Sequence, residues 1–390
     1  MSTFGLRVSL FFAALFLVYG VHIPFLPLWL EWRGLTPTEI GLVTSAPYLA
    51  RLFVTPTVGV FADRVGDHAR IVRMLSGVAL LAALLLSQSV SFVAIFAAAL
   101  TLAVATWTIM PLTETVAIRG VRLGLDYGRM RLWGSLSFIA ATFIGGAAVD
   151  WFGRGAGVWL IVFGLAATLA AAFLLPGPAE GGARAPSRGI DAGAVWRLVR
   201  DPRFLLFLGA IGMVHASHAA FYTFGAIHWR ATGLSSLAIG ALWGIGVLTE
   251  IALFAVSRRL MDRFGAVTLL AAGAGAALLR WLAMSFDPAH VLLVPLQILH
   301  GLSYGAAHLG AIHFIDRAVP QRAGGTAQAL YATMAAGVMH GGATLLSGLL
   351  YGRLGEATYL AMAAMAAIGI MCSFGLSRCW SGEELSLERD

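Results

Sequence analysis

Residues 34–66 read GLTPTEIGLVTSAPYLARLFVTPTVGVFADRVG, and parts of this stretch recur 199 residues later in the chain. Apolar letters match by chance between any two hydrophobic helices, but a charged motif kept in register at the far end does not. The two copies match at both ends, with Gly34-Leu35-Thr36 on Gly233-Leu234-Ser235, Asp63-Arg64 on Asp262-Arg263, and Gly66 on Gly265. The chain is therefore an internal duplication of two related halves.

The composition indicates which solvent surrounds these halves. Of the 390 residues, 59% are hydrophobic and 12% are charged. A soluble domain has about 25% charged and 45–50% apolar residues, so this chain has too little charge to cover a water-exposed surface. It is also far too apolar to be disordered. Helices of about 20 residues span a bilayer, and we predict a polytopic helical membrane protein.

Apolar runs between Gly, Pro and Arg breaks predict twelve spans. They cover residues 6–30, 37–61, 69–88, 91–118, 129–151, 155–175, 203–230, 235–259, 266–286, 289–317, 323–352 and 355–378. Thr36-Pro37-Thr38-Glu39 predicts a capping box with proline at the first helical position. We expect a six-helix bundle over 1–175, a cytoplasmic linker over 176–202, a second six-helix bundle over 203–380, and a tail over 381–390. The predicted fold is thus all-α, with twelve transmembrane helices in two pseudo-symmetric bundles.

The basic residues predict the orientation of the spans. All 26 are Arg, and the formal charge is +7. The twelve-span arrangement places 20 of them on the side of both termini and the linker and 4 on the other side, while Arg51 and Arg280 lie inside spans. This asymmetry predicts cytoplasmic termini, and it explains the basic charge without a nucleic-acid partner. The first apolar run lacks a cleavage site, so we expect no signal peptide. The two cysteines imply no disulfide framework.

Several motifs resemble a known family. Residues 59–66, GVFADRVG, are similar to the signature loop of the major facilitator superfamily. Three segments resemble the 3-phenylpropionic acid transporter family and its relatives, the lactose-type proton symporters: DYGRMRLWGS at 126–135, HAAFY at 218–222 and QILH at 297–300. The resemblance implies a major facilitator fold, in which two helical bundles rock about a central cavity. It also implies a conformational latch at Gly59, Asp63 and Arg64.

Charges inside the spans are the candidates for function. A charge at the centre of a bilayer costs about 2.5–3.5 kcal/mol on insertion scales, so it needs a reason. Glu250 lies well inside its span, and the repeat offset places Arg51 at the equivalent position of the other half. A coupled pair of functional groups and a structural ion pair both fit that arrangement.

The family resemblance assigns further residues to the cavity. It suggests Glu114 and Arg131 as residues facing the substrate, and Arg280 with His300 as a charged and imidazole pair. One departure is that the glutamate which carries the proton three residues after the histidine in lactose-type permeases is Ser303 here. We therefore expect Glu250 to carry the proton, with His300 as its competitor.

Aromatic residues on the helices of these charges predict the substrate. Trp133, His218 and Tyr222 lie on the same helices as cationic or imidazole groups, and an apolar slot beside a cation suits an aromatic monocarboxylate. No metal ligand set, phosphate-binding glycine loop or nucleophile elbow is present, so we expect no cofactor and no enzymatic activity.

The sequence therefore favours a monomeric, proton-coupled symporter of the inner membrane that imports a small organic anion such as 3-phenylpropionate. Three other functions stay open: a sugar or nucleoside symporter, a drug/proton antiporter, and a membrane sensor. The sensor requires a soluble output domain, for which the short tails leave no room.

Overall fold

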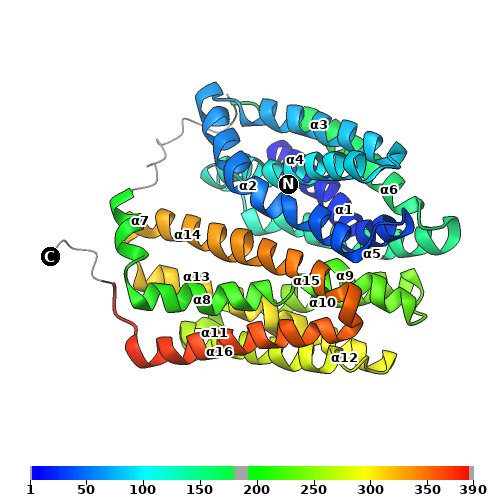
Figure 1. Ribbon diagram of the computed structural model, residues 1–390. Helices are drawn as coiled ribbons and strands as arrows, with labels where there is room; N and C mark the ends of the chain where they lie inside the picture. The colour runs from blue at the N-terminus through cyan, green and yellow to red at the C-terminus, as the bar shows by residue number, and fades with distance from the viewer. Residues whose placement is uncertain (1, 179, 181–191, 386–390) are drawn as a thin grey trace. The chain divides into compact units, whose positions relative to one another are not determined.

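The computed structural model describes residues 2–178, 180 and 192–385, and every regular element within them is a helix (Figure 1). The first half holds α1 Thr3–Trp32, α2 Pro37–Val65, α3 His68–Gln88, α4 Phe92–Arg122, α5 Tyr127–Phe152 and α6 Ala156–Leu174. The second half holds α7 Ala192–Leu198, α8 Pro202–Ala216, α9 Ala219–Ala231, α10 Ser236–Ala255, α11 Ser257–Met284, α12 His290–His300, α13 Ala307–Ala318, α14 Gly324–Thr333, α15 His340–Leu354 and α16 Thr358–Cys379. Two π-helical turns, η1 Gly301–Ala306 and η3 Met334–Met339, join α12 to α13 and α14 to α15. The predicted all-α fold is confirmed.

Nine helical stretches of the described residues are long and apolar enough to cross a membrane. They are Thr3–Trp32, His68–Gln88, Phe92–Arg122, Tyr127–Phe152, Ala156–Leu174, Pro202–Ala231, Ser236–Ala255, Ser257–Met284 and Gln321–Cys379. The protein is therefore a multi-pass membrane protein. The last stretch alone runs for 59 residues, and α2 is not among the nine. The number of twelve spans stays a prediction.

The repeated stretch has glycines with positive φ angles at matching positions in both halves. Gly34 and Gly233 have φ angles of +85° and +100°, and Gly66 and Gly265 have φ angles of +73° and +71°. Glycine enters this left-handed region without the steric cost that other residues meet. Gly66 ends α2 in the left-handed conformation, whereas Gly265 lies at a kink inside α11 with a ψ angle of 169°.

The start of α2 follows from its sequence. The Thr36 hydroxyl accepts the backbone N–H of Glu39 at 3.3 Å, and the Glu39 carboxylate accepts the backbone N–H of Thr36 at 2.8 Å. These two bonds satisfy donors that the first turn of a helix leaves open. The predicted capping box is confirmed.

The described residues divide by packing into two units. One falls within Met1–Ala185 and Tyr222–Gly244, and the other within Pro186–Phe221 and Ile245–Asp390. We call them unit 1 and unit 2; α9 and α10 contribute to both. The bundle boundaries expected at residues 175 and 203 stay predictions. Residues 179 and 181–191 of the expected linker, and residues 386–390 of the expected tail, lie outside the described residues.

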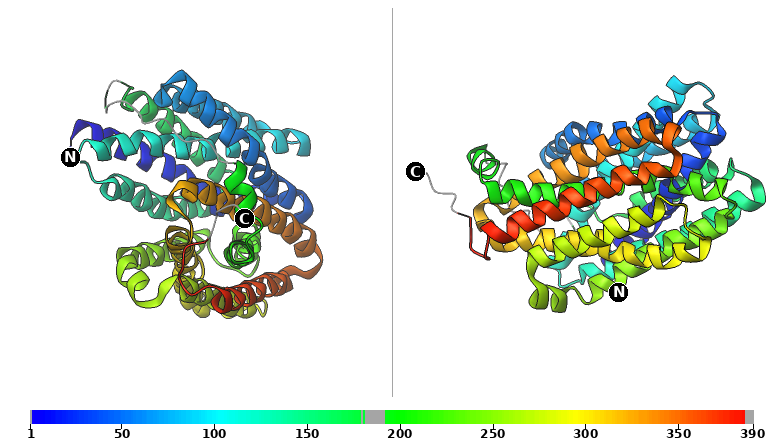
Figure 2. Two further views of the ribbon diagram at one scale, coloured as in Figure 1. Left: turned by 90° about the vertical axis from the view of Figure 1, so that its left-hand side faces the viewer. Right: turned by 60° about the horizontal axis from the view of Figure 1, so that its bottom comes forward.

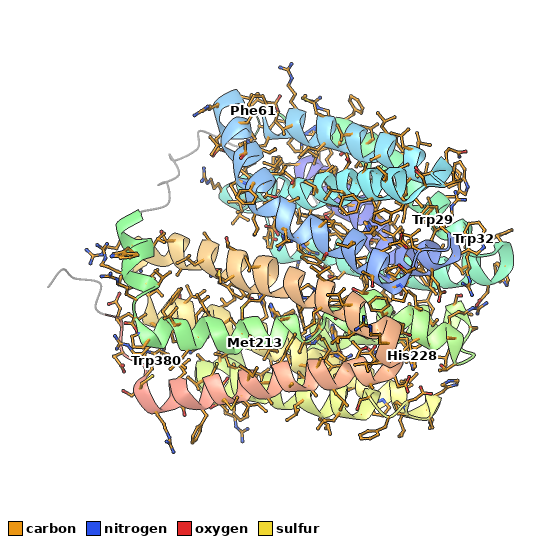
Figure 3. The ribbon with its side chains drawn as sticks, in the orientation of Figure 1. Trp29, Trp32, Phe61, Met213, His228 and Trp380 are labelled. Carbon is orange, nitrogen blue, oxygen red and sulfur yellow. The ribbon has the colours of Figure 1, made fainter. Side chains whose placement is uncertain are left out.

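Unit 1 is built around α1, which packs against α5 and α6, while α3 packs against α4 and α6. A Cβ on Gly20 of α1 would lie 2.5 Å from the carbonyl oxygen of Phe138 in α5, so the close approach of these helices requires glycine. Aromatic side chains lie at both ends of the unit. Figure 3 labels Trp29 and Trp32 at one end of α1 and Phe61 near the opposite end of α2.

One carboxylate ties α5 to the start of α10 within unit 1. Asp150 accepts the backbone N–H groups of Ser236 and Leu237 at 2.9 Å each, and it pairs with Arg230 at 3.0 Å. The carboxylate thus caps the N-terminus of a helix distant in sequence, where it also meets the positive end of the helix dipole.

Unit 2 places α16 beside both α8 and α11, and α11 beside α13 and η1. The green α8 and the red α16 run side by side in Figure 2. The end of the described chain is fixed on this unit. The backbone N–H of Leu385 donates to the Ala318 carbonyl, and Arg203 pairs with Glu383 at 3.3 Å. Hydrogen bonds from Ser381 lower the pKa of exposed Glu383 to about 2.

Candidate functional site

Unit 1 contains a cavity whose empty volume is about 530 Å³, its open mouth included. Most of its wall is apolar, and three of its side chains are aromatic: Tyr48 of α2, Trp107 of α4 and Tyr222 of α9. The full lining is His22, Ile23, Leu26, Pro27, Val43, Thr44, Pro47, Tyr48, Ala99, Ala103, Trp107, Tyr222 and Thr223. An apolar cavity with few polar groups is the usual form of a small-molecule site.

Arg51 stands beside two of the lining rings. Its guanidinium carbon is 5.3 Å from the Trp107 ring centroid and 5.6 Å from that of Tyr48, and the two rings are 4.7 Å apart. Arg51 follows Tyr48 by three residues, so the two lie on neighbouring positions of one helix face. Arg51, which the sequence analysis singled out as a charge inside a span, thus lies beside the aromatic side chains of the cavity.

Arg131 and Glu114 form a second polar group in unit 1. The Tyr127 hydroxyl donates to the Glu114 carboxylate at 3.3 Å, and Tyr127 also interacts with Arg131, one turn further along α5. The Arg131 guanidinium carbon lies 4.0 Å from the ring centroid of Phe16. The two residues that the family resemblance pairs are therefore joined through a tyrosine. Trp133 is 49% exposed and does not line the cavity.

Unit 2 buries a network of charged and polar side chains. Glu250 Oε1 is 2.8 Å from His300 Nε2, and the other ring nitrogen, His300 Nδ1, is 2.9 Å from Arg280 Nη1. Arg280 also donates to Ser303 Oγ at 3.0 Å and to Gln297 Oε1 at 3.2 Å. Three of the residues that sequence reasoning singled out, Glu250, Arg280 and His300, therefore lie in direct contact.

The chemistry of the donors fixes where the protons lie. Arginine only donates, so His300 Nδ1 accepts from Arg280 and His300 Nε2–H donates to the Glu250 carboxylate. Ser303 likewise accepts from Arg280 and donates to His218 Nε2 at 3.1 Å, which leaves His218 Nδ1–H for the Val214 carbonyl at 2.8 Å. Arg280 is thus the common donor of two branches, one ending at Glu250 and the other at His218.

Arg280 is 1% exposed, and such a buried charge needs compensation. Its guanidinium carbon is 4.5 Å from the Trp281 ring and 5.2 Å from the Phe221 ring, so two aromatic faces add cation–π attraction. The Glu250 carboxylate supplies the opposite charge through His300. Arg280 and His300, the pair that the family resemblance predicted, thus lie in contact, and Glu250 balances the charge of Arg280.

Two glycines allow α10 to approach α12 closely enough for this contact. A Cβ on Gly301 would lie 2.9 Å from the Thr249 carbonyl oxygen, and one on Gly246 would lie 3.2 Å from His300 Cδ2. The π turn η1 begins at Gly301 and contains Ser303. Such turns are rare and recur at functional sites.

A stack of rings continues from His300 into unit 2. Tyr304 stacks on His300 at 5.7 Å and on His215 at 4.7 Å between ring centroids, and His215 stacks on His308 at 6.3 Å. His308 Nδ1 is 2.8 Å from the Tyr331 hydroxyl. Within the part of the chain that the structure describes, no group of three or more His, Cys, Asp or Glu side chains could hold a metal ion.

The predicted latch residues lie at the end of α2. Asp63 Oδ1 is 2.9 Å from His68 Nε2, and Arg119 donates to His68 Nδ1 at 3.2 Å. This chain links α2, α3 and α4 within unit 1. Arg64 is exposed, and a Cβ on Gly59 would meet no atom within 4 Å. The latch function of these residues stays a prediction.

Sequence reasoning missed several residues of these sites, chiefly His22, Tyr48, Tyr127 and Gln297. His22 carried a usable signal, because it is an ionisable residue inside the first apolar run. Tyr48 lies one turn before Arg51, and Tyr127 one turn before Arg131, so helical spacing from a known charge would have found both.

Comparison with known proteins places the chain. Residues 5–361 match the MFS_1 like family. A probable 3-phenylpropionic acid transporter of Escherichia coli (strain K12) is 33% identical over 361 residues, which cover 90% of this chain and 92% of that protein. The maltose permease of Geobacillus stearothermophilus is 29% identical over 93% of this chain and 92% of its own. The crystal structure of the nucleoside transporter NupG shares the fold, with a TM-score of 0.80 at 18% identity over 97% of this chain and 99% of that one.

These matches confirm the resemblance to the major facilitator superfamily that the sequence motifs predicted. The family and the similar proteins are transporters, and the protein is accordingly not an enzyme. The chain belongs to the MFS_1 like family.

Proposed function

We propose that the protein is a proton-coupled symporter that imports a small organic anion, with an aromatic monocarboxylate such as 3-phenylpropionate as its substrate. The observation that carries proton coupling is the 2.8 Å contact between Glu250 and His300 beside buried Arg280. A carboxylate and an imidazole in one hydrogen bond are the two side chains best suited to exchange a proton near neutral pH. The name of the relative that is 33% identical supports the substrate class.

The proton enters the cycle on Glu250. With Glu250 ionised, His300 Nε2–H donates to its carboxylate and the negative charge balances Arg280. A proton that binds Glu250 removes this negative charge, and an anion that binds elsewhere on the carrier restores it. Binding of the anion and of the proton therefore favour each other, which is coupling in the thermodynamic sense. The monoanion and its proton cross the membrane as a neutral pair.

The aromatic ring of the substrate occupies the cavity of unit 1, and its carboxylate binds a guanidinium. Arg51 is the first candidate, because it stands beside Tyr48 and Trp107, which line that cavity. Arg131 is the second, since its family resemblance is stronger while its group with Tyr127 and Glu114 is already hydrogen-bonded. Guanidinium binds a carboxylate through two parallel bonds that lysine cannot reproduce.

A sugar symporter is the second candidate function. The Glu114–Tyr127 pair offers an acceptor and a hydroxyl of the kind that binds sugar hydroxyl groups, and a maltose permease is 29% identical. Direct comparison of ligands separates the two candidates. Purified protein is screened by thermal shift with 3-phenylpropionate, benzoate, maltose, melibiose and uridine. Stabilisation by the aromatic acids supports the proposal, and stabilisation by sugars alone overturns it.

We further propose that the protein is a monomer in the inner membrane, with lipid around it and both termini in the cytoplasm. The asymmetric distribution of arginine supports this orientation. Cys379, the exposed last residue of α16, provides the test. A membrane-impermeant maleimide is expected to label it in inverted vesicles and not in intact cells, with Cys379→Ser as the background control. Labelling in intact cells contradicts the orientation.

A further inference from the structure

The cavity of unit 1 contains a polar group that no described residue satisfies. His22 is 9% exposed, lines the cavity, and makes no hydrogen bond with any residue that the structure describes. Its Nδ1 is buried without a hydrogen-bond partner, so Nε2 is the ring nitrogen that we expect a ligand in the cavity to reach. A buried polar group without a partner costs free energy until a ligand satisfies it.

Three prolines add hydrogen-bond acceptors to the same wall. Proline has no N–H, so the carbonyl four residues earlier loses its regular helical donor. Pro27 of α1 does this to Ile23, Pro47 of α2 to Val43, and Pro111 of α4 to Trp107. All three of these affected residues line the cavity, as do Pro27 and Pro47 themselves.

The polar groups that we consider in this cavity are therefore the imidazole of His22 and backbone carbonyls, rather than side-chain hydroxyls. The side-chain hydroxyl of Thr44, by contrast, already donates to the Ile40 carbonyl at 2.7 Å. The cavity accordingly offers aromatic walls for a ring, one imidazole, and lining residues whose backbone carbonyls lack their regular helical donor. A ligand that is wholly apolar at its ring end leaves these groups unsatisfied.

We propose that the cavity selects aromatic carboxylates that bear a ring hydroxyl, and that His22 Nε2 binds this hydroxyl. A phenolic hydroxyl donates as well as accepts, so it matches either tautomer of His22. A site built to bind a hydroxyl rejects an analogue that lacks it, because its own polar groups then stay unpaired. This inference rests on the proposed function and narrows its substrate to hydroxyaryl carboxylates.

The test compares affinities of the full-length purified protein for 3-phenylpropionate and for its 2-, 3- and 4-hydroxy analogues by isothermal titration. At least one hydroxy analogue is expected to bind about two- to tenfold more tightly, the range of a net neutral hydrogen bond. His22→Leu abolishes that preference while it still binds 3-phenylpropionate. His22→Gln keeps a donor and an acceptor and retains part of the preference.

Thr57→Val is the matched control, because it removes a hydroxyl of α2 that lies outside the cavity lining and whose bond to the Phe53 carbonyl stays within its own helix. It leaves the hydroxyl preference unchanged. Methoxy analogues identify the tautomer, since a methoxy oxygen only accepts and binds well only where Nε2 carries the proton.

The experiment distinguishes failure of the proposed function from failure of the inference that His22 binds a ring hydroxyl. If no aromatic acid binds the wild-type protein, the proposed function falls. If aromatic acids bind with no preference for a hydroxyl, or if His22→Leu keeps the preference, this inference falls and the proposed function stands.

Discussion

Replacement of Glu250 by glutamine separates substrate binding from proton coupling. The amide keeps the side-chain length and leaves an oxygen where Glu250 Oε1 now accepts from His300 Nε2 at 2.8 Å. Only the charge-assisted part of that bond is lost. Bonds to charged groups contribute about 1.5–3 kcal/mol and neutral ones about 0.5–1.5, so the bond to His300 weakens by about 1 kcal/mol. The neutral amide resembles the protonated carboxyl, which favours the bound anion, so we expect no loss of substrate affinity.

Accumulation is lost, however, because glutamine cannot take up the proton. If one proton accompanies each monoanion, the pair is neutral and only the pH difference drives it. One pH unit corresponds to about 1.36 kcal/mol, which is about tenfold accumulation. In proteoliposomes that are one unit more alkaline inside, we expect about tenfold accumulation of labelled 3-phenylpropionate by the wild type and none by Glu250→Gln. Uptake by protein-free vesicles is subtracted, since the protonated acid crosses lipid unaided.

Two further measurements complete this experiment: substrate exchange by Glu250→Gln, and accumulation by a control variant. Exchange of labelled for unlabelled substrate at equal pH persists in Glu250→Gln, because exchange needs no net proton movement. Glu39→Gln is the matched control, since glutamine also forms a capping box at the start of α2, and it accumulates substrate like the wild type. Tenfold accumulation by Glu250→Gln would refute the reasoning and move the proton to His300 or Glu114.

Three further variants test the remaining contacts. Arg51→Lys is expected to weaken binding of 3-phenylpropionate about tenfold or more in titration calorimetry, because lysine loses the paired geometry; a larger loss in Arg131→Lys with unchanged affinity in Arg51→Lys would transfer the anchor to Arg131. Asp63→Asn removes the charged partner of His68, so transport in vesicles slows while affinity changes less than about twofold; equal losses of both would contradict a latch. Asp150→Ala removes a helix cap and an ion pair, which costs about 1–2 kcal/mol and lowers the midpoint of thermal unfolding; an unchanged midpoint would show that the cap contributes nothing.

The sequence predicted the features that depend on local rules. Thr36 and Glu39 follow the spacing of a capping box, and the structure forms that box. The buried charge of Glu250 was conspicuous because an unpaired carboxylate is costly in lipid. Local rules also fail at known places. Asp150 caps a helix 86 residues away from it in sequence, and no spacing rule connects it to Ser236.

The ring stack of unit 2 is a second feature that helical spacing in the sequence does not fully predict. At 3.6 residues per turn, His300 and His308 lie about 80° apart on a regular helix. The π turn Gly301–Ala306 absorbs about one extra residue, which removes about 100° and nearly aligns the two rings. The sequence carries no strong signal for such a turn, because its residues are as helix-compatible as their neighbours. The sequence thus places His300 and His308 on one broad helix face, and the closer alignment of these residues with Tyr304 emerges only from the structure.

The position of Arg280 as the common donor of two hydrogen-bonded branches has a consequence for proton transfer between them. A proton hops along a chain only if each member can accept one proton and pass on another, and guanidinium never accepts. Arg280 therefore passes no proton between the Glu250–His300 pair and the Ser303–His218 branch. If Glu250 carries the proton as we propose, that proton does not pass through Arg280 to His218. The side chain that balances the Glu250 carboxylate thus also separates the two hydrogen-bonded branches with respect to proton transfer.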